Sequence, residues 1–344
     1  AGPISAGALP GPACYGQGGT EPTVTDANLV LGRLSPTGLL DGAMPLDPVV
    51  AETSLKPVAD KVGVSLQEAA LGVLAIAVAN MTRSVRRMSV ERGRDPREFV
   101  LMAFGGAGAL HAREVAAELG MGEILVPLSP GIVCAEGLLV SDQKEDFVAS
   151  LRLPLHADRM SVAADTVTDL AARAAEWFDA ENLPDATRTM ELALDLRYVG
   201  QNFELIVPVA AAPSLSEADM PDIKALANAF FAAHDRAYGF HDPGAAIEIV
   251  NFRMTARGRL YDAEDIPEPG KAQPMPEPTG HRPVWFNGYA SVDTPIYRRE
   301  TLAPGMTFTG PAIIDQLDAT TPVHPGDMVD VRPDGSMLIA LKGA

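Results

Sequence analysis

The spacing of apolar and polar residues predicts helices in the first part of the chain. Over residues 66–88, apolar positions recur at three- and four-residue steps, which is typical of a long helix with one buried face. Ser65 precedes this stretch and Glu68 follows three positions later, as in a capping box. Two shorter helices are expected, over residues 26–34 with Thr25 as N-cap and around residues 50–62.

The segment that follows alternates strand-like and helix-like stretches. Phe99–Phe104 (FVLMAF) is a continuous apolar run of strand length, and the glycines at 105, 106 and 108 turn the chain. Residues 109–119 return to helical spacing, 123–127 (EILVP) form a second strand, and 131–140 begin another helix. This order predicts a βαβ unit and therefore a parallel sheet covered by helices.

The pattern changes after about residue 146. Helical spacing covers 160–180 and 223–238, whereas 190–209 reads as two strand arms around Gly200 and 247–260 as a further strand. The last sixty residues read as short strands between Pro/Gly turns. We therefore expect an α/β domain over 1–145 and an α+β, β-rich domain over 146–344, with a Pro-rich connector at 264–283.

Composition places the chain among acidic globular proteins. Its 344 residues hold 27 Lys+Arg against 45 Asp+Glu, a net charge of −18, and 47% are hydrophobic. Nucleic acids and anionic membranes would repel such a chain, so we expect neither as a partner. The longest apolar run, 69–79, is far shorter than the ~20 residues that span a bilayer. With two cysteines and no signal-peptide pattern, we expect a cytoplasmic location.

The glycine turn is the strongest candidate site. Gly105, Gly106 and Gly108 lack Cβ atoms, so a planar or phosphate-bearing ligand can approach the backbone beside a helix N-terminus. Tight packing of the helix on the strand explains such a turn equally well. The segment matches neither GxxxxGK[ST] nor the dinucleotide-binding GxGxxG fingerprint.

The histidines and the arginine-rich stretch give weaker signals. His111 reads as a packed residue, and His234 and His241 are seven apart without an evident third ligand, so no metal site is expected. The basic residues at the end of the 66–88 helix and beyond it read as solvated; they are Arg83, Arg86, Arg87, Arg92 and Arg94.

Other polar residues remain without a role in the sequence. Asp195, Arg197, Tyr198 and Gln201 cluster near a bend between strands and read as exposed polar candidates. Cys14 lies in a Gly/Pro loop and is either a reactive thiol or, by the simpler interpretation, a small buried residue. No Ser-His-Asp, HExxH or CxxC arrangement can be assembled, so the sequence assigns no catalytic residue.

Several blocks resemble the hydantoinase A/5-oxoprolinase family and span nearly the whole chain. The blocks are 11–34 (GPACYGQGGTEPTVTDANLVLGRL), 104–112 (FGGAGALHA), 126–142 (VPLSPGIVCAEGLLVSD), 196–205 (LRYVGQNFEL), 230–253 and 310–326 (GPAIIDQLDATTPVHPG). The resemblance implies a partial actin/hexokinase/Hsp70-like ATPase domain in the N-terminal part. It also implies that Gly105, Gly106 and Gly108 contact adenosine.

The resemblance further implies an ATP- and Mg-dependent hydrolase that opens a hydantoin or 5-oxoproline ring through a phosphorylated lactam. A hydantoinase B-type subunit is the expected partner, and homo-oligomers are possible. Phosphate loops of the DxGGTxTD type are absent, so the chain resembles the C-terminal portion of such a subunit and is expected not to hydrolyse ATP alone. The alternatives are a subunit of an ATP-dependent ketone carboxylase and a binding or assembly module without activity.

Overall fold

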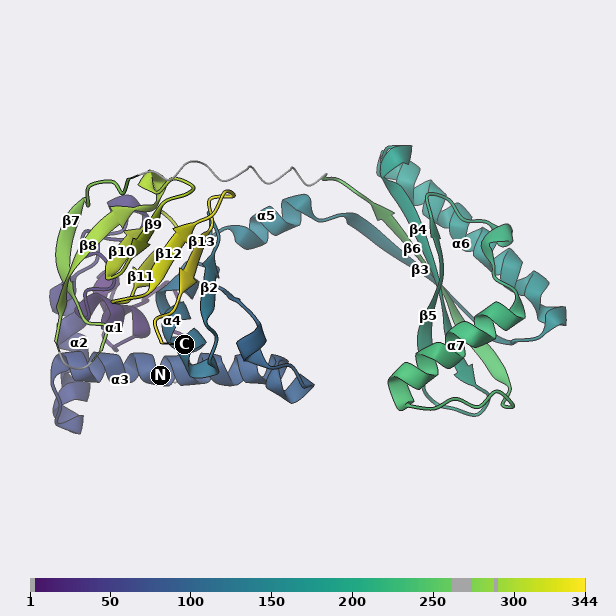
Figure 1. The fold of residues 1–344 in the computed structure, drawn as a ribbon, viewed down its shortest axis with the longest axis horizontal. Helices are drawn as coiled ribbons and strands as arrows, with labels where there is room; N and C mark the ends of the chain where they lie inside the picture. The colour runs from purple at the N-terminus through teal and green to yellow at the C-terminus, as the bar shows by residue number, and fades with distance from the viewer. Residues whose placement is uncertain (1–3, 262–273, 288–289, 344) are drawn as a thin grey trace. The chain divides into compact units, whose positions relative to one another are not determined.

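The computed structural model describes residues 4–261, 274–287 and 290–343, and the chain folds into two compact units (Figure 1). Unit 1 comprises Ala1–Glu136 together with Asp265–Ala344, and unit 2 is Gly137–Glu264. This division differs from the one expected from the sequence, where everything after residue 145 forms a second domain. The C-terminal segment belongs to unit 1 because its last strand pairs with a strand near residue 125.

Unit 1 contains helices whose caps follow local sequence signals. Ser65 and Glu68 form the expected capping box at the start of α3. At α1 the N-cap is Thr23 rather than Thr25, since the Asp26 carboxylate accepts a hydrogen bond from the Thr23 backbone N–H. The helix therefore begins two residues earlier than expected. The helices are α1 (Val24–Val30), α2 (Pro48–Val62), α3 (Leu66–Met88) and α4 (Gly108–Leu119), and α5 (Val133–Val140) runs across the unit boundary.

Two mixed sheets complete unit 1. One has the order β1-β2-β13-β12-β9 and the other β11-β10-β8-β7. Their strands are β1 (Leu101–Met102), β2 (Glu123–Val126), β7 (Gly280–Val284), β8 (Val292–Arg298), β9 (Thr307–Thr309), β10 (Ala312–Asp315), β11 (Thr320–Val323), β12 (Met328–Val331) and β13 (Met337–Ala340).

The βαβ unit expected from the sequence is present, because β1 and β2 pair in parallel with α4 between them in the chain. The run expected as a strand over 99–104 forms only two ladder residues. On its other side β2 pairs antiparallel with β13, so the sheet is mixed rather than parallel. The buried side of α4 packs on this sheet through residues such as Val115, Ala116 and Leu119.

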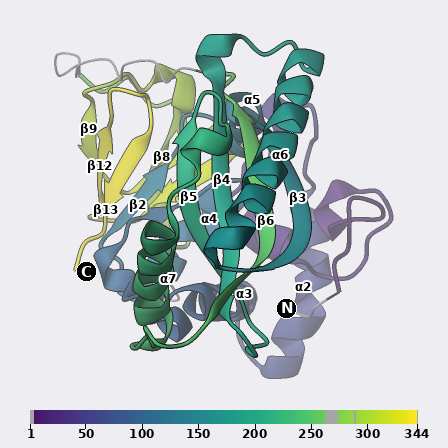
Figure 2. The ribbon, with the colours of Figure 1, turned by 90° about the vertical axis from the view of Figure 1, so that its right-hand side faces the viewer.

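Unit 2 is one antiparallel sheet with two helices on the same face (Figure 2). The strand order is β3-β6-β4-β5, and Phe178, Phe230 and Phe252 lie in the core between sheet and helices. Helices 160–180 and 223–238 are confirmed, and the long edge strand β3 is missing from the sequence prediction. The elements are β3 (Gln143–Pro154), α6 (Met160–Ala180), β4 (Arg188–Tyr198), β5 (Leu205–Ala212), α7 (Ile223–Tyr238) and β6 (Ile247–Gly258).

The expected connector at 264–283 is described only in its last part. Residues 262–273 lie outside the described residues, and from Gly280 the chain forms strand β7 instead of a connector. Pro283 is tolerated there because β7 is an edge strand.

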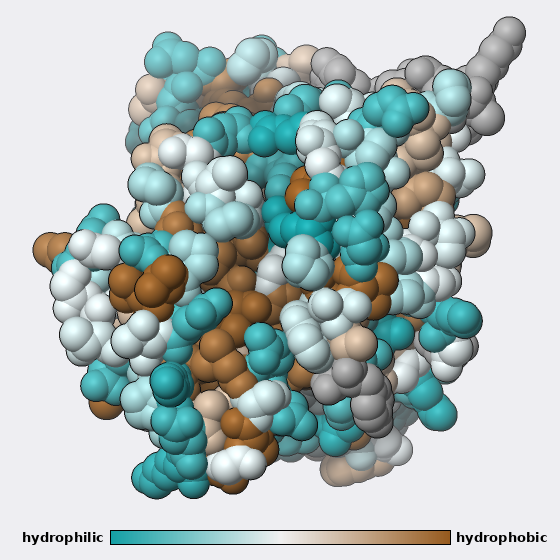
Figure 3. Space-filling model, turned by 90° about the vertical axis from the view of Figure 1, so that its left-hand side faces the viewer, coloured by the Kyte–Doolittle hydropathy of each residue, from teal (hydrophilic) through white to brown (hydrophobic). Residues whose placement is uncertain are grey.

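One helix of the described residues, Leu66–Arg92, is long and apolar enough to cross a membrane by length and composition, with 28% of its apolar window buried. A single such helix is weak evidence, since core helices pass the same test. Apolar surface also gathers along the middle of one face of the molecule, between hydrophilic side chains (Figure 3).

Candidate ligand site at the glycine turn

The glycine turn is anchored on one side and open on the other. The backbone N–H of Ala103 donates to Leu125 (2.8 Å), and that of Gly105 donates to Pro130 (2.6 Å), so the turn is fixed to β2 and to the loop after it. Gly105 has a φ of +82°, which favours glycine, whereas Gly106 has no such constraint. A Cβ added to Gly106 would lie 3.4 Å from the Asp318 carbonyl oxygen and nowhere closer to other atoms. The open side therefore leaves room for a ligand.

The three glycines border different spaces. Gly106 and Ala107 line a cavity of about 460 Å³, called the main cavity below. Gly108 lines a second, more apolar cavity of about 340 Å³ between α3, β1 and α4, together with His111. Gly105 contributes to neither of these two cavities. Of the three residues expected to contact one ligand, only Gly106 faces the main cavity.

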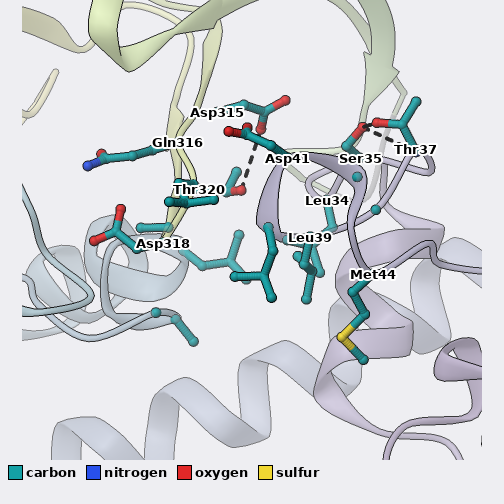
Figure 4. Close-up of a pocket in the computed structure, with 18 of the residues that line it drawn as sticks. Leu34, Ser35, Thr37, Leu39, Asp41, Met44, Asp315, Gln316, Asp318 and Thr320 are labelled. Atoms are coloured by element: carbon teal, nitrogen blue, oxygen red, sulfur yellow. Dashed lines mark hydrogen bonds between the residues drawn. The ribbon is translucent and has the colours of Figure 1, made fainter.

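Three segments that are distant in sequence surround the main cavity (Figure 4). They are the glycine turn, the loop that follows α1 (residues 34–44) and the turn between β10 and β11 (residues 315–320). Leu34, Leu39 and Met44 supply apolar surface from the loop, whereas polar side chains come from both the loop and the turn. The cavity therefore has both apolar and polar walls.

The loop over residues 34–44 holds a strained backbone. Leu40 and Asp41 have φ values of 53° and 54°, in the left-handed region where each L-residue costs about 1–2 kcal/mol. The loop is closed by paired backbone hydrogen bonds between Leu39 and Met44, at 2.8 and 3.1 Å. Asp41 also accepts a hydrogen bond from Arg298 on β8. These contacts keep the loop in a conformation that the local sequence alone disfavours.

The turn between β10 and β11 is fastened to the loop after β2. Asp318 Oδ2 accepts a hydrogen bond from Gly131 N (2.7 Å), and Gln316 Nε2 donates to the Leu128 carbonyl (2.6 Å). These partners are 187 and 188 residues apart in the chain. The block at 310–326 has no role that can be read from the sequence, because no residue near it in the chain indicates that it lies beside Gly106.

The polar walls of the main cavity are acidic. Asp41, Asp315 and Asp318 line the cavity, and among its described lining residues the only cation is Arg298. Arg298 is engaged by Glu300 (2.9 Å) and by Asp41, and these two carboxylates raise the pKa of its guanidinium. A ligand would therefore meet carboxylates and no unpaired cation on these walls.

An ion-pair network joins Arg33, which precedes the loop over residues 34–44, to Glu114 on α4. Arg33, 1% exposed, donates to Glu114 Oε1 on α4 (2.6 Å) and to the carbonyls of Trp285 and Phe286. His324 Nε2 lies 3.4 Å from the same Glu114 oxygen. Burial opposes ionisation of Glu114, but the nearby His324 ring and the Arg33 charge outweigh it and lower its pKa to about 2.

His111 and Cys14 are buried, as their simpler interpretations predicted. Burial lowers the pKa of His111, so its neutral form is favoured, and its Nδ1 has no partner among the described residues. Cys14 is 1% exposed, and burial together with a hydrogen bond to Asp26 raises the pKa of its thiol far above the usual range. The alternative of a reactive thiol at Cys14 is therefore wrong for this structure.

The other histidines have structural partners in unit 2. His234 is buried among aromatic rings with Nδ1 2.5 Å from the Phe240 carbonyl, and His241 pairs with Asp235 (2.8 Å). Among the described residues, no group of three or more His, Cys, Asp or Glu side chains is placed to hold a metal ion.

The polar cluster expected to be exposed near residue 200 is mostly buried. Asp195 is fully buried and accepts hydrogen bonds from Asn251 (2.6 Å) and Arg253 (2.8 Å). Arg197 pairs with Glu248 (2.8 Å), and Tyr198 is buried, whereas Gln201 is exposed. The prediction was wrong because the sequence does not show that the strand expected over 247–260, which is β6, pairs with β4 and places Asn251, Arg253 and Glu248 beside this cluster.

Comparison with known proteins gives matches over the whole chain. The hydantoinase/oxoprolinase family model matches residues 1–147, and the model of the hydantoinase/oxoprolinase C-terminal domain matches residues 156–344. An uncharacterized protein of Methanocaldococcus jannaschii is 37% identical over 98% of this chain and 47% of its own length. Caprolactamase subunit alpha of Pseudomonas jessenii is 33% identical over 97% of this chain and 48% of its own length.

Solved structures agree with these matches. The ATP-dependent caprolactamase from Pseudomonas jessenii has a TM-score of 0.74 at 32% identity, covering 98% of this chain and 49% of that one. A nucleotide-free acetone carboxylase has a TM-score of 0.85 at 26% identity, with the same coverage. The chain therefore spans about half the length of these relatives. From the two family models and the structural matches, the chain belongs to the hydantoinase/oxoprolinase family.

Proposed function

We propose that this chain is the C-terminal portion of a subunit of an ATP- and Mg-dependent enzyme that hydrolyses a cyclic amide, with a hydantoin or 5-oxoproline ring as substrate. The observation that carries the proposal is the main cavity, where Gly106 presents bare backbone opposite the turn of residues 315–320. Relatives named as caprolactamase and 5-oxoprolinase support the amide-hydrolase class.

The residues present fit the adenosine portion of ATP. The cavity, at about 460 Å³, lies within the usual range for small-molecule sites, and Gly106 allows a flat ring to approach the backbone closely. When bound in the complete enzyme, ATP supplies a phosphoryl group that converts the amide oxygen into a leaving group. The part of this chain is to hold and orient the nucleoside, since positioning dominates phosphoryl-transfer catalysis.

A second subunit of the hydantoinase B type is the proposed partner. The relatives include proteins named as alpha, beta and gamma subunits, which supports a heteromeric assembly. We also propose a cytoplasmic location, and that the assembly can contain more than one copy of this chain.

Ketone carboxylation is the second candidate reaction. The observation in its favour is the TM-score of 0.85 to acetone carboxylase, against 0.74 for caprolactamase. An assembly module without activity of its own is the third.

The test expresses a subunit of the relatives' length together with its partner and measures phosphate release. Hydantoin, 5-oxoproline, caprolactam and acetone with bicarbonate are supplied in separate reactions. We expect ring-dependent ATP hydrolysis that Gly106→Val lowers at least tenfold, because the added side chain fills the nucleoside space. Gly72→Val is the matched control, since a Cβ at Gly72 meets nothing within 4 Å and Gly72, in α3, does not line the main cavity. Phosphate release that requires acetone and bicarbonate, and occurs with none of the ring compounds, would favour the carboxylase. An equal loss of ATP hydrolysis in Gly106→Val and Gly72→Val would contradict the role of Gly106.

A further inference from the structure

The charge of the main cavity limits what can enter it. Asp41, Asp315 and Asp318 line its polar walls, and Arg298 is already bound by two carboxylates. Asp41 is paired with Arg298 and Asp315 with Arg282 (3.4 Å), so among the described lining residues Asp318 is the carboxylate without a cation partner. The uncapped N-terminus of α4 contributes only about half a positive charge, which does not offset this carboxylate. A phosphate or carboxylate brought into this space meets like charge and no unpaired cation among the described lining residues.

The same walls suit an uncharged ring. Leu34, Leu39 and Met44 provide apolar surface for its faces. Asp318 accepts one hydrogen bond through Oδ2, from Gly131, and an ionised carboxylate can accept about four. It can therefore also accept from a ligand N–H or O–H. Ribose hydroxyls are often held by a carboxylate in this way.

We infer that the main cavity admits an uncharged ring with hydrogen-bonding groups at its edge and excludes anionic groups. The inference rests on the proposed function in one respect: adenosine is the favoured occupant because Gly106 borders the cavity. Its triphosphate then projects out of the cavity, away from Asp41 and Asp318. A neutral lactam is the other possible occupant, because it is also an uncharged ring with hydrogen-bonding groups at its edge. The carboxylate of 5-oxoproline, by contrast, is excluded from this space. Asp318 and Asp41 are thus residues that determine specificity.

The experiment is isothermal titration calorimetry of the 344-residue chain without Mg, using adenosine, AMP, ATP, caprolactam and 5-oxoproline. We expect adenosine to bind, and AMP and ATP to bind at least tenfold more weakly. The difference should shrink as salt rises from about 0.05 M to 0.5 M, because screening weakens charge repulsion. Asp318→Asn and Asp41→Asn should each bring the affinities for ATP and adenosine closer together. Asp60→Asn, an exposed carboxylate on α2, makes the same change in net charge and should leave the ratio unaltered.

The outcomes separate this inference from the proposed function. If ATP binds as tightly as adenosine or more tightly, and Gly106→Val abolishes both, the inference is overturned and the nucleotide role of Gly106 stands. If caprolactam binds, 5-oxoproline does not and adenosine does not, the preference for an uncharged ring is supported and the adenosine role fails. If no probe binds, or binding persists in Gly106→Val, both the inference and the adenosine role are overturned.

Discussion

The ion pair between Arg33 and Glu114 offers a direct test of how unit 1 is held together. Glu114→Gln removes the negative charge with little change of shape. Arg33 is 1% exposed, so its charge stays buried among uncharged acceptors, which are the new amide oxygen and the Trp285 and Phe286 carbonyls. Removing one partner of a buried ion pair is strongly destabilising because the other charge is left uncompensated.

The magnitude follows from the pKa of Glu114. It is lowered from 4.5 to about 2, and at 1.36 kcal/mol per pKa unit the ionised form gains about 3 kcal/mol of stability on folding. Because the folded-state pKa is the lower one, this stability is present above pH 4.5 and is lost as the pH falls toward 2. Glu114→Gln should therefore cost about 3 kcal/mol at pH 7 and less than half of that at pH 3.

The assay is urea unfolding followed by tryptophan fluorescence in a Trp177→Phe background. Trp285 then reports on unit 1 alone, because Trp177 lies in α6 of unit 2. Glu118→Gln, an exposed position on the same helix, is the control and should change stability by less than about 0.5 kcal/mol. A loss below 1 kcal/mol at pH 7, or an equal loss at pH 7 and pH 3, would refute the reasoning.

Three further predictions concern buried polar groups. Iodoacetamide should modify exposed Cys134 in the native protein and Cys14 only after unfolding, as mass spectrometry of the peptides would reveal. Asp26→Asn should destabilise unit 1 by about 2 kcal/mol in the same fluorescence assay, since the carboxylate accepts four hydrogen bonds. A change within 0.5 kcal/mol would contradict this. Asp195→Ala should cost unit 2 about 2 kcal/mol, read from Trp177 fluorescence in a Trp285→Phe background, because Arg253 loses its carboxylate partner; an unchanged unfolding midpoint would count against it.

Sequence patterns were sufficient where the structure depends on neighbours within a few residues. The capping box of Ser65 and Glu68 fixed the start of α3, and the bounds of α6 and α7 followed from helical spacing. The order strand, glycine turn, helix, strand around Gly106 was likewise readable, because each signal lies inside its own segment. Even here the N-cap of α1 was misplaced by two residues, since two threonines were available and the Asp26 contact decided between them.

The tertiary structure alone decided which distant segments meet. Strand β13 pairs with β2, so the C-terminal segment belongs to unit 1. The turn that carries Asp318 lies beside Gly106 because its side chains form hydrogen bonds with the backbone of Gly131 and Leu128, which are 187 and 188 positions away in the chain. It also decided that Asp195 is buried against β6. Strand pairing and burial of charges depend on partners that no local window contains. The glycine turn was therefore visible in the sequence, and the acidic cavity around it was not.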